Sequence, residues 1–167
     1  MIKPMHYFAY GSNMSLARMR ARVPSARVIA VARLGGHRLM FHKVGKDGSG
    51  KCDIVKTGDQ NDLVYGVVYD IAPAEKPWLD RVEGLGAGYD EKPVRVMTQA
   101  GVELVAVSYV ATHIDACLTP YSWYKAHVLH GAGEHGLPAD YIRVLELVRA
   151  NEDPDRDRHK REVSLYR

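Results

Sequence analysis

The sequence predicts an α+β fold, in which a small mixed, mostly antiparallel β-barrel is flanked by helices. Two observations lead to this prediction. Strand-like runs with short connections fill the chain up to residue 111, and after Pro120 the apolar residues change to a helical period. Short connections favour antiparallel pairing, and six or seven strands in one sheet tend to curl or close. With 167 residues, one domain over 1–167 is expected, residues 151–167 forming a peripheral tail.

The chain begins with a predicted strand over residues 6–10, which is short and rich in aromatic side chains. A helix is predicted over residues 15–20, and Pro24 ends it. Ser12 or Asn13 is available as the N-cap of this helix, because both side chains accept hydrogen bonds from free backbone N–H groups.

Further runs dense in β-branched and aromatic residues predict strands over residues 26–34, 37–44, 52–56, 63–71, 89–98 and 102–111. One short helix interrupts them, opening at Pro73 and ending near Glu83 and Gly84. Two final helices are predicted over residues 121–130 and 138–149, with the glycine-rich segment 131–136 as the loop between them.

Composition and charge exclude several classes of protein. Apolar residues make up 46% of the chain and charged residues 26%, as in soluble globular proteins, and no apolar stretch approaches the 18 or so residues of a membrane span. No export signal is visible, and two cysteines are too few for a disulfide framework. The net charge of +3 is modest. We therefore expect a cytoplasmic protein without a membrane or nucleic-acid partner.

Residues 45–52 read GKDGSGKC, which fits the phosphate-loop pattern G-x-x-x-x-G-K except at the final position. There Cys52 replaces the Ser or Thr that binds Mg²⁺. A phosphate loop also needs a helix directly after it, and here a strand is predicted instead. The pattern favours a surface hairpin over a nucleotide site.

Other candidates for chemistry are weaker. His127, His130 and His135 lie close together, but no cysteine pair or third ligand follows at a usual spacing, so they are interpreted as helix-surface histidines and no metal site is predicted. Ser12 stands at a strand-to-turn junction without the G-x-S-x-G pattern of a nucleophile elbow. A serine hydrolase is therefore not favoured.

Tyr10, Gly11, Ser12 and Asn13 end the first strand in a segment suited to binding an anion. Glycine permits a sharp turn that aims successive backbone N–H groups into one concavity, and the following helix adds positive partial charge. A small carboxylate fits such a site. An ordinary strand–turn–helix junction produces the same pattern, so both interpretations stay open at this point.

Glu83 is the second feature. It stands where a short helix ends, before the glycine-rich residues 84–88. A carboxylate at a helix C-terminus meets the negative end of the helix dipole, which is electrostatically unfavourable. This placement suits an acid/base catalyst, although a solvated glutamate at a helix end is the simpler interpretation.

Taken together, these motifs resemble the γ-glutamyl cyclotransferase and AIG2-like family. The first strand reads Y-F-A-Y-G-S-N over residues 7–13, and G-V-V-Y follows at 66–69. An L-D-x-x-E-G segment spans 79–84, and residues 87–89, which read A-G-Y, loosely match a G-x-Y step. A later stretch over 124–141 is also similar. The resemblance covers residues 7–147, with its motifs in the same order.

The resemblance implies a role for each matching residue. Glu83 corresponds to the general acid/base, and Tyr124 to a tyrosine that closes the substrate pocket. The γ-glutamyl group would be held by Tyr7, Phe8, Ala9, Tyr10, Gly11, Ser12 and Asn13, with the turn amides on its α-carboxylate. It implies no metal or organic cofactor. The expected partner is a small γ-glutamyl molecule, and a homodimer stays open.

The implied reaction is the intramolecular cyclisation of a γ-glutamyl amide to 5-oxoproline, with release of an amine or amino acid. Two alternatives stay open: a protein of the same fold that acts on a different γ-glutamyl amide, and a non-catalytic module that binds a small carboxylate. The sequence does not identify the leaving amine.

Overall fold

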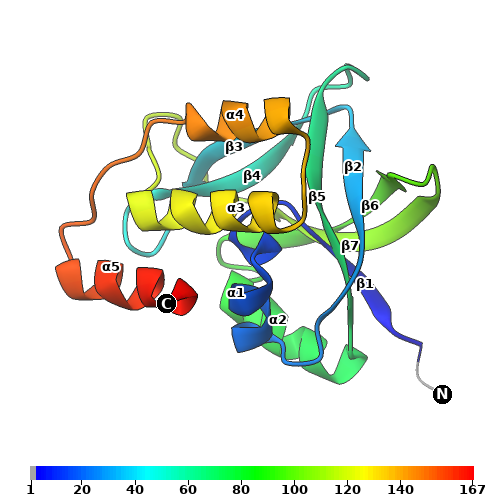
Figure 1. Ribbon diagram of the computed structural model, residues 1–167, viewed down its shortest axis with the longest axis horizontal. Helices are drawn as coiled ribbons and strands as arrows, with labels where there is room; N and C mark the ends of the chain where they lie inside the picture. The colour runs from blue at the N-terminus through cyan, green and yellow to red at the C-terminus, as the bar shows by residue number, and fades with distance from the viewer. Residues whose placement is uncertain (1–2) are drawn as a thin grey trace.

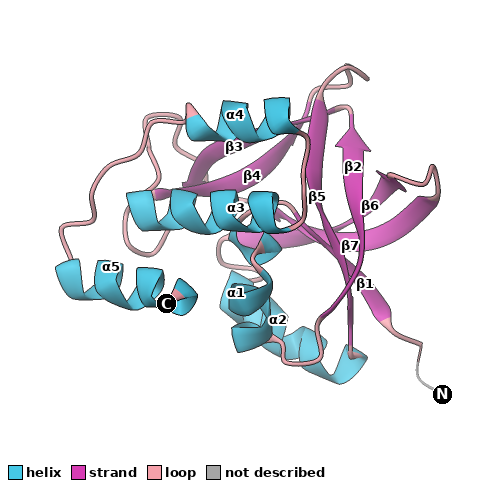
Figure 2. Ribbon diagram, in the orientation of Figure 1, coloured by secondary structure: helices cyan, strands magenta, loops and turns pink. Residues whose placement is uncertain are grey.

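The computed structural model describes residues 3–167 and places five strands in a closed barrel (Figures 1 and 2). In their order around the barrel these are β1 (Met5–Ala9), β5 (Leu63–Ile71), β2 (Arg27–Gly35), β6 (Tyr89–Thr98) and β7 (Glu103–Ala111). All neighbours pair antiparallel except β1 and β7, whose parallel contact at Tyr7 and Val107 closes the barrel. The predicted mixed, mostly antiparallel barrel is confirmed.

The two remaining strands stay outside the barrel. β3 (His37–Val44) and β4 (Gly50–Lys56) form a separate antiparallel sheet. The reason is that both edges of β2 are already paired, one with β5 and the other with β6, so β3 finds no free edge after the turn at Gly36. The glycine-rich loop between them is followed by a strand, which confirms the predicted hairpin. A phosphate loop would need a helix at that place.

Helices cover one side of the barrel and one of its ends (Figure 1). They are α1 (Leu16–Arg22), α2 (Lys76–Glu83), α3 (Ser122–Glu134), α4 (Ala139–Glu146) and α5 (Arg156–Val163), with 3₁₀ turns at η1 (Ser12–Met14), η2 (Pro73–Glu75) and η3 (Ser164–Tyr166). Along residues 3–167, none of the helices has the length and apolar character needed to cross a membrane.

The core lies inside the barrel and between the barrel and the helices. β5 is buried along nearly its whole length, because one face lines the barrel and the other contacts helical residues. On that second face the ring of Tyr65 lies 5.1 Å from the ring of Tyr141 on α4. The hydroxyl of Tyr69 donates to the carbonyl of Met14 in η1 at 2.8 Å. The core therefore fixes η1, the turn that follows the first strand, against the barrel wall.

Helix α3 corrects one prediction. It continues through Gly131 and Gly133 to Glu134, where a loop was expected. At Gly131 the backbone of η1 lies so close that an added Cβ would come within 2.5 Å of the Met14 carbonyl carbon. Glycine here permits two elements to touch, and does not end the helix.

The N-cap of α1 was also predicted wrongly. The cap is Ser15, whose Oγ accepts from the N–H of Arg18 at 3.4 Å. Ser12 and Asn13 belong instead to η1, a 3₁₀ turn placed before the helix. Their side chains are thereby free for contacts elsewhere.

The C-terminal residues 151–167, which were predicted to be peripheral, contain α5 and η3. α5 and η3 pack on α3, where they contact the buried side chain of His127. Its Nε2 lies 2.8 Å from Glu162 Oε2, and its Nδ1 lies 2.6 Å from the hydroxyl of Tyr166. His127 is therefore not the helix-surface histidine of the prediction, but the residue that holds the C-terminal segment. Glu162 also accepts from Arg18 of α1 at 2.8 Å.

The pH dependence of the free energy of unfolding tests whether Glu162 holds the C-terminal segment on α3. The hydrogen bond with His127 and the charge of Arg18 lower the pKa of Glu162 from 4.5 to about 2, although burial acts in the opposite direction. A lowered carboxyl pKa contributes stability above pH 4.5, which is lost as the pH falls toward 2. Glu162→Gln should therefore reduce the free energy of unfolding more at pH 7 than at pH 3, measured by urea denaturation. Glu152→Gln, an exposed position, should change neither value. Equal losses at both pH values would contradict the ion pair.

Candidate active site

An inner pocket of about 30 Å³ lies at the end of β1, between the barrel and α3. It is lined by Tyr7, Tyr10, Gly11, Ser12, Asn13, Cys52, Glu83, Tyr89, Tyr109 and Tyr124. The structure thus brings Glu83 and Tyr124 together with five of the seven predicted residues of the first motif. Phe8 and Ala9 do not line the pocket, because they are buried in the core.

Gly11 was expected to permit a sharp turn, but the structure gives a different reason for glycine at this position. Its φ of −115° is not in the left-handed region. An added Cβ would instead lie 2.9 Å from the Cβ of Cys52 and 3.3 Å from the hydroxyl of Tyr124. Glycine at this position lets the turn after β1 approach β4 and α3 closely, which places the backbone of the turn at the pocket.

The turn presents unpaired backbone donors. Among the residues that the structure describes, neither the N–H of Ser12 nor that of Asn13 donates a hydrogen bond to another residue. Both residues are buried and line the pocket. Buried N–H groups without a partner are rare in folded proteins, and a ligand with acceptor oxygens would satisfy them.

Glu83 projects toward the same turn from the last position of α2. Its side chain is only 15% exposed. Its Oε1 accepts from Nδ2 of Asn13 at 2.7 Å and from Nη1 of Arg22 at 3.2 Å. Within residues 3–167 its other oxygen, Oε2, has no hydrogen-bond partner. One oxygen thus fixes the carboxylate, and the other is available to a ligand.

The phenol hydroxyl of Tyr7 extends this arrangement. It accepts a hydrogen bond from Nδ2 of Asn13 at 3.1 Å. Burial, followed by the charge of Glu83, raises the pKa of Tyr7 far above its ordinary value. The phenol therefore keeps its proton at neutral pH and can donate it in a hydrogen bond to a ligand.

Among the described residues that line the pocket, neither Cys52 nor Ser12 is activated as a nucleophile for covalent catalysis. Burial raises the pKa of the Cys52 thiol to about 12, so a thiolate does not form at neutral pH. The hydroxyl of Ser12 accepts from Nε of Arg18 at 3.2 Å, and no histidine or carboxylate of the described chain is bound to it as a base.

No metal site is evident within residues 3–167, because nowhere in this range do three or more His, Cys, Asp or Glu side chains form a group that could hold a metal ion.

Tyr124 joins α3 to β4 at the pocket. It comes from α3, and its hydroxyl accepts from the N–H of Cys52 in β4 at 3.0 Å. Tyr124→Phe would leave this buried N–H unpaired, so we expect a loss of about 1–3 kcal/mol in the free energy of unfolding, together with a higher KM for the γ-glutamyl compounds that the sequence motifs imply as substrates. Urea denaturation and steady-state kinetics measure the two effects. Tyr121→Phe, whose hydroxyl makes a longer, 3.3 Å bond, is the control. An unchanged KM and kcat would show that the Tyr124 ring only packs.

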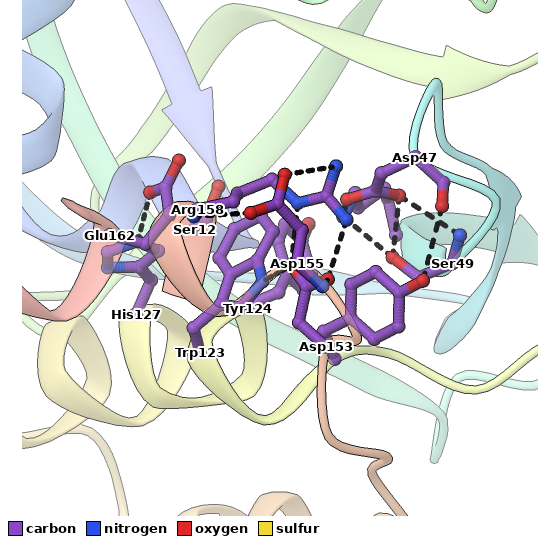
Figure 3. A network of polar contacts seen from close by, with 12 residues as sticks. Ser12, Asp47, Ser49, Trp123, Tyr124, His127, Asp153, Asp155, Arg158 and Glu162 are labelled. Carbon is purple, nitrogen blue, oxygen red and sulfur yellow. Dashed lines mark hydrogen bonds and ion pairs between the residues drawn. The ribbon is translucent and has the colours of Figure 1, made fainter. Parts of the chain in front are cut away.

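An outer cleft of about 440 Å³ adjoins the inner pocket, sharing Ser12, Glu83, Tyr89 and Tyr124 with it. Figure 3 shows part of its wall, including Arg158, which contacts Asp153, and Glu162, which contacts His127. The cleft is rich in cations that the sequence reasoning missed: Arg18, Arg22, Lys43, Lys46, Lys51 and Arg158. These lysines and arginines come from segments far apart in the chain, and no local motif marks them.

Comparisons with known proteins agree with the fold and with the motifs. A family model described as AIG2-like family matches residues 63–145. The human and bovine proteins named gamma-glutamylcyclotransferase are each 36% identical to this chain, over 87% of it and 79% of their own length. A solved structure named gamma-glutamyl cyclotransferase is 31% identical and superposes with a TM-score of 0.86, covering 95% of this chain and 99% of its own. The chain therefore belongs to the γ-glutamylcyclotransferase family.

Proposed function

We propose that the protein cyclises a γ-glutamyl amide to 5-oxoproline, with Glu83 as the general acid/base. The observation that supports this most is the arrangement of Glu83, which is fixed through Oε1 and free at Oε2 beside unpaired turn amides. A small-molecule substrate is proposed, and the reaction requires no cofactor.

The chemistry uses a nucleophile that the substrate carries. The free α-amino group of the γ-glutamyl unit attacks the γ-carbonyl carbon, which forms a new C–N bond and a five-membered ring. The bond to the departing amine then breaks. Because the substrate holds both reacting groups, the enzyme needs to keep it folded, and well-oriented intramolecular reactions reach effective molarities of about 10⁵–10⁸ M.

Proton transfer is the task that remains for a side chain. An α-ammonium group, with a reference pKa of about 7.7–8.0, must lose a proton before it attacks. Glu83 Oε2 would accept that proton and then deliver it to the departing nitrogen, so the carboxylate is regenerated in each cycle. The second proton that the attacking nitrogen loses as it becomes the ring amide would pass to the released amine, which leaves as an ammonium. The N–H groups of Ser12 and Asn13 would hold the α-carboxylate or the oxyanion, and each oxyanion donor is typically worth about 2.7–4 kcal/mol.

The size of the site sets how a substrate lies. The inner pocket has room for only a few water molecules in this conformation, whereas the outer cleft is more than ten times larger. A γ-glutamyl compound would therefore span both, with its reacting carbonyl near Glu83 and its leaving group in the outer cleft.

The direct test is an assay of the purified protein with γ-glutamyl-L-alanine. We expect 5-oxoproline and alanine to appear in equal amounts. Tight binding of glutamate or 5-oxoproline without turnover would contradict the proposal and favour a binding module. Turnover of other γ-glutamyl amides but not of this one would support the alternative of a different substrate.

A further inference from the structure

Arg22 is the last residue of α1 and lines the outer cleft. The dipole of a helix favours a cation at this end. The Arg22 side chain is 24% exposed, and that of Glu83, with which it forms an ion pair, is 15% exposed. The pair is therefore mostly shielded from water, and salt screens it less than an ion pair on an open surface.

Three side chains form a closed triangle of hydrogen bonds at the pocket. Nη1 of Arg22 donates both to Oδ1 of Asn13 and to Oε1 of Glu83, each at 3.2 Å. Nδ2 of Asn13 donates to the same Oε1 at 2.7 Å. If the Asn13 amide turned over, its oxygen would face the carboxylate and its NH₂ group would face the guanidinium, so that acceptor met acceptor and donor met donor. Arg22 therefore fixes both the carboxylate and the amide that contacts it.

Other ionisable groups face Glu83 from the elements packed around it. They are Tyr7 on β1, Lys43 on β3, Tyr89 on β6, Tyr109 on β7 and Tyr124 on α3. Burial raises the pKa of each of the four phenols, so they carry no charge near neutral pH. The ammonium of Lys43 is close enough to interact with Glu83 but forms no ion pair with it in the described chain. Arg22 is thus the cation that contacts the carboxylate directly.

We propose that Arg22 is a positioning residue that keeps Glu83 ionised before the substrate binds and thereby sets the low-pH limit of activity. This inference rests on the proposed function, in which Glu83 must be a carboxylate to take the proton from the substrate ammonium. The positive charge favours the ionised carboxylate, so a protein without it would protonate Glu83, and lose its base, at a higher pH.

The pH profile of kcat/KM for γ-glutamyl-L-alanine tests this role, because it reports the ionisation of the free enzyme. Arg22→Gln removes the charge and retains an amide donor. We expect the pH at which kcat/KM falls to half of its plateau to rise by about one pH unit, the lower part of the range for a carboxyl group beside an arginine, since the pair keeps some contact with water. On the plateau, kcat/KM should stay within about threefold of the wild-type value. A residue that only packs would lower kcat/KM by the same factor at every pH.

Three further variants control for the other effects of the change. Arg22→Lys keeps the charge but loses the planar fork, so its low-pH limit should stay close to that of the wild type. Arg20→Gln removes the same charge from the last turn of the same helix, at an exposed position that lines neither the pocket nor the cleft, and should leave the profile unchanged. If thermal unfolding shows that Arg22→Gln does not fold, Arg22→Met, which keeps the aliphatic stem, provides the same test.

The outcomes distinguish this inference from the proposed function. An unchanged low-pH limit in Arg22→Gln, or an equal loss of kcat/KM at every pH, would overturn the inference and leave the proposed function standing. A wild type that releases no 5-oxoproline would overturn the proposed function. If the wild type were active and Glu83→Gln equally so, Glu83 would not be the base, and the role of Arg22 would be overturned with it.

Discussion

Replacement of Glu83 by Gln is expected to lower kcat for 5-oxoproline release by about 10²–10⁴-fold, the range typical of a general acid/base. Glutamine retains the shape of glutamate and an oxygen that accepts from Asn13 and Arg22, so the pocket should stay intact. It has no basic oxygen with which to take the proton from the substrate ammonium. Steady-state kinetics with γ-glutamyl-L-alanine measure the loss.

Two further measurements make the Glu83 result decisive. The thermal unfolding temperature of Glu83→Gln should stay close to that of the wild type, which separates lost chemistry from lost folding. Glu103→Gln, the same change at an exposed position on β7, should keep full activity. If Glu83→Gln retained full turnover, Glu83 would not be the general acid/base, although the proposed reaction itself would stand.

The second large effect concerns the contact between α3 and the turn after β1. Gly131→Ala is expected to reduce the free energy of unfolding by about 1–3 kcal/mol, because the new methyl group would collide with backbone atoms of Met14 and Ser15 at 2.5 Å. A backbone cannot move aside as a flexible side chain does. Since the turn carries Ser12 and Asn13, activity should fall together with stability. Urea denaturation and the 5-oxoproline assay measure both.

Gly133→Ala is the matched control for this prediction. It lies in the same helix, two residues further on, and a Cβ there would meet no atom within 4 Å. Alanine is the better helix former, so this variant should be more stable than the wild type by about 0.5–1 kcal/mol. If both variants shifted stability in the same direction, the close contact at Gly131 would be absent in solution.

The secondary structure was largely predictable because it depends on local patterns. The strand limits at 63–71 and 89–98 agree with β5 and β6, whose dense β-branched and aromatic side chains are a local property. The prediction failed at residues 131–136, where glycine was interpreted as a helix end. Glycine is also tolerated in a helix when another backbone packs against it, and that contact, made by η1, is separated from Gly131 by more than a hundred residues.

The candidate site was only partly predictable. The motif at residues 7–13 and the glutamate at 83 are readable in the sequence, because each belongs to a short continuous segment. Arg22, which holds the carboxylate of Glu83, has no such signal, and neither does Lys43. His127 was misplaced on a surface because the C-terminal segment that covers it follows 35 residues later. Long-range contacts of this kind produce no periodic pattern in the sequence.

Local patterns were enough to predict that this chain forms an α+β barrel and carries the motifs of its family, because strand alternation, helix period and short motifs are properties of short segments. Three features became visible only in the folded chain: Glu83 and the turn after β1 share one pocket, β3 and β4 stay outside the barrel, and Lys43 lines the adjoining cleft. The physical reason is that edge pairing and charge neutralisation depend on which distant segments meet, and the closure of the barrel decides that.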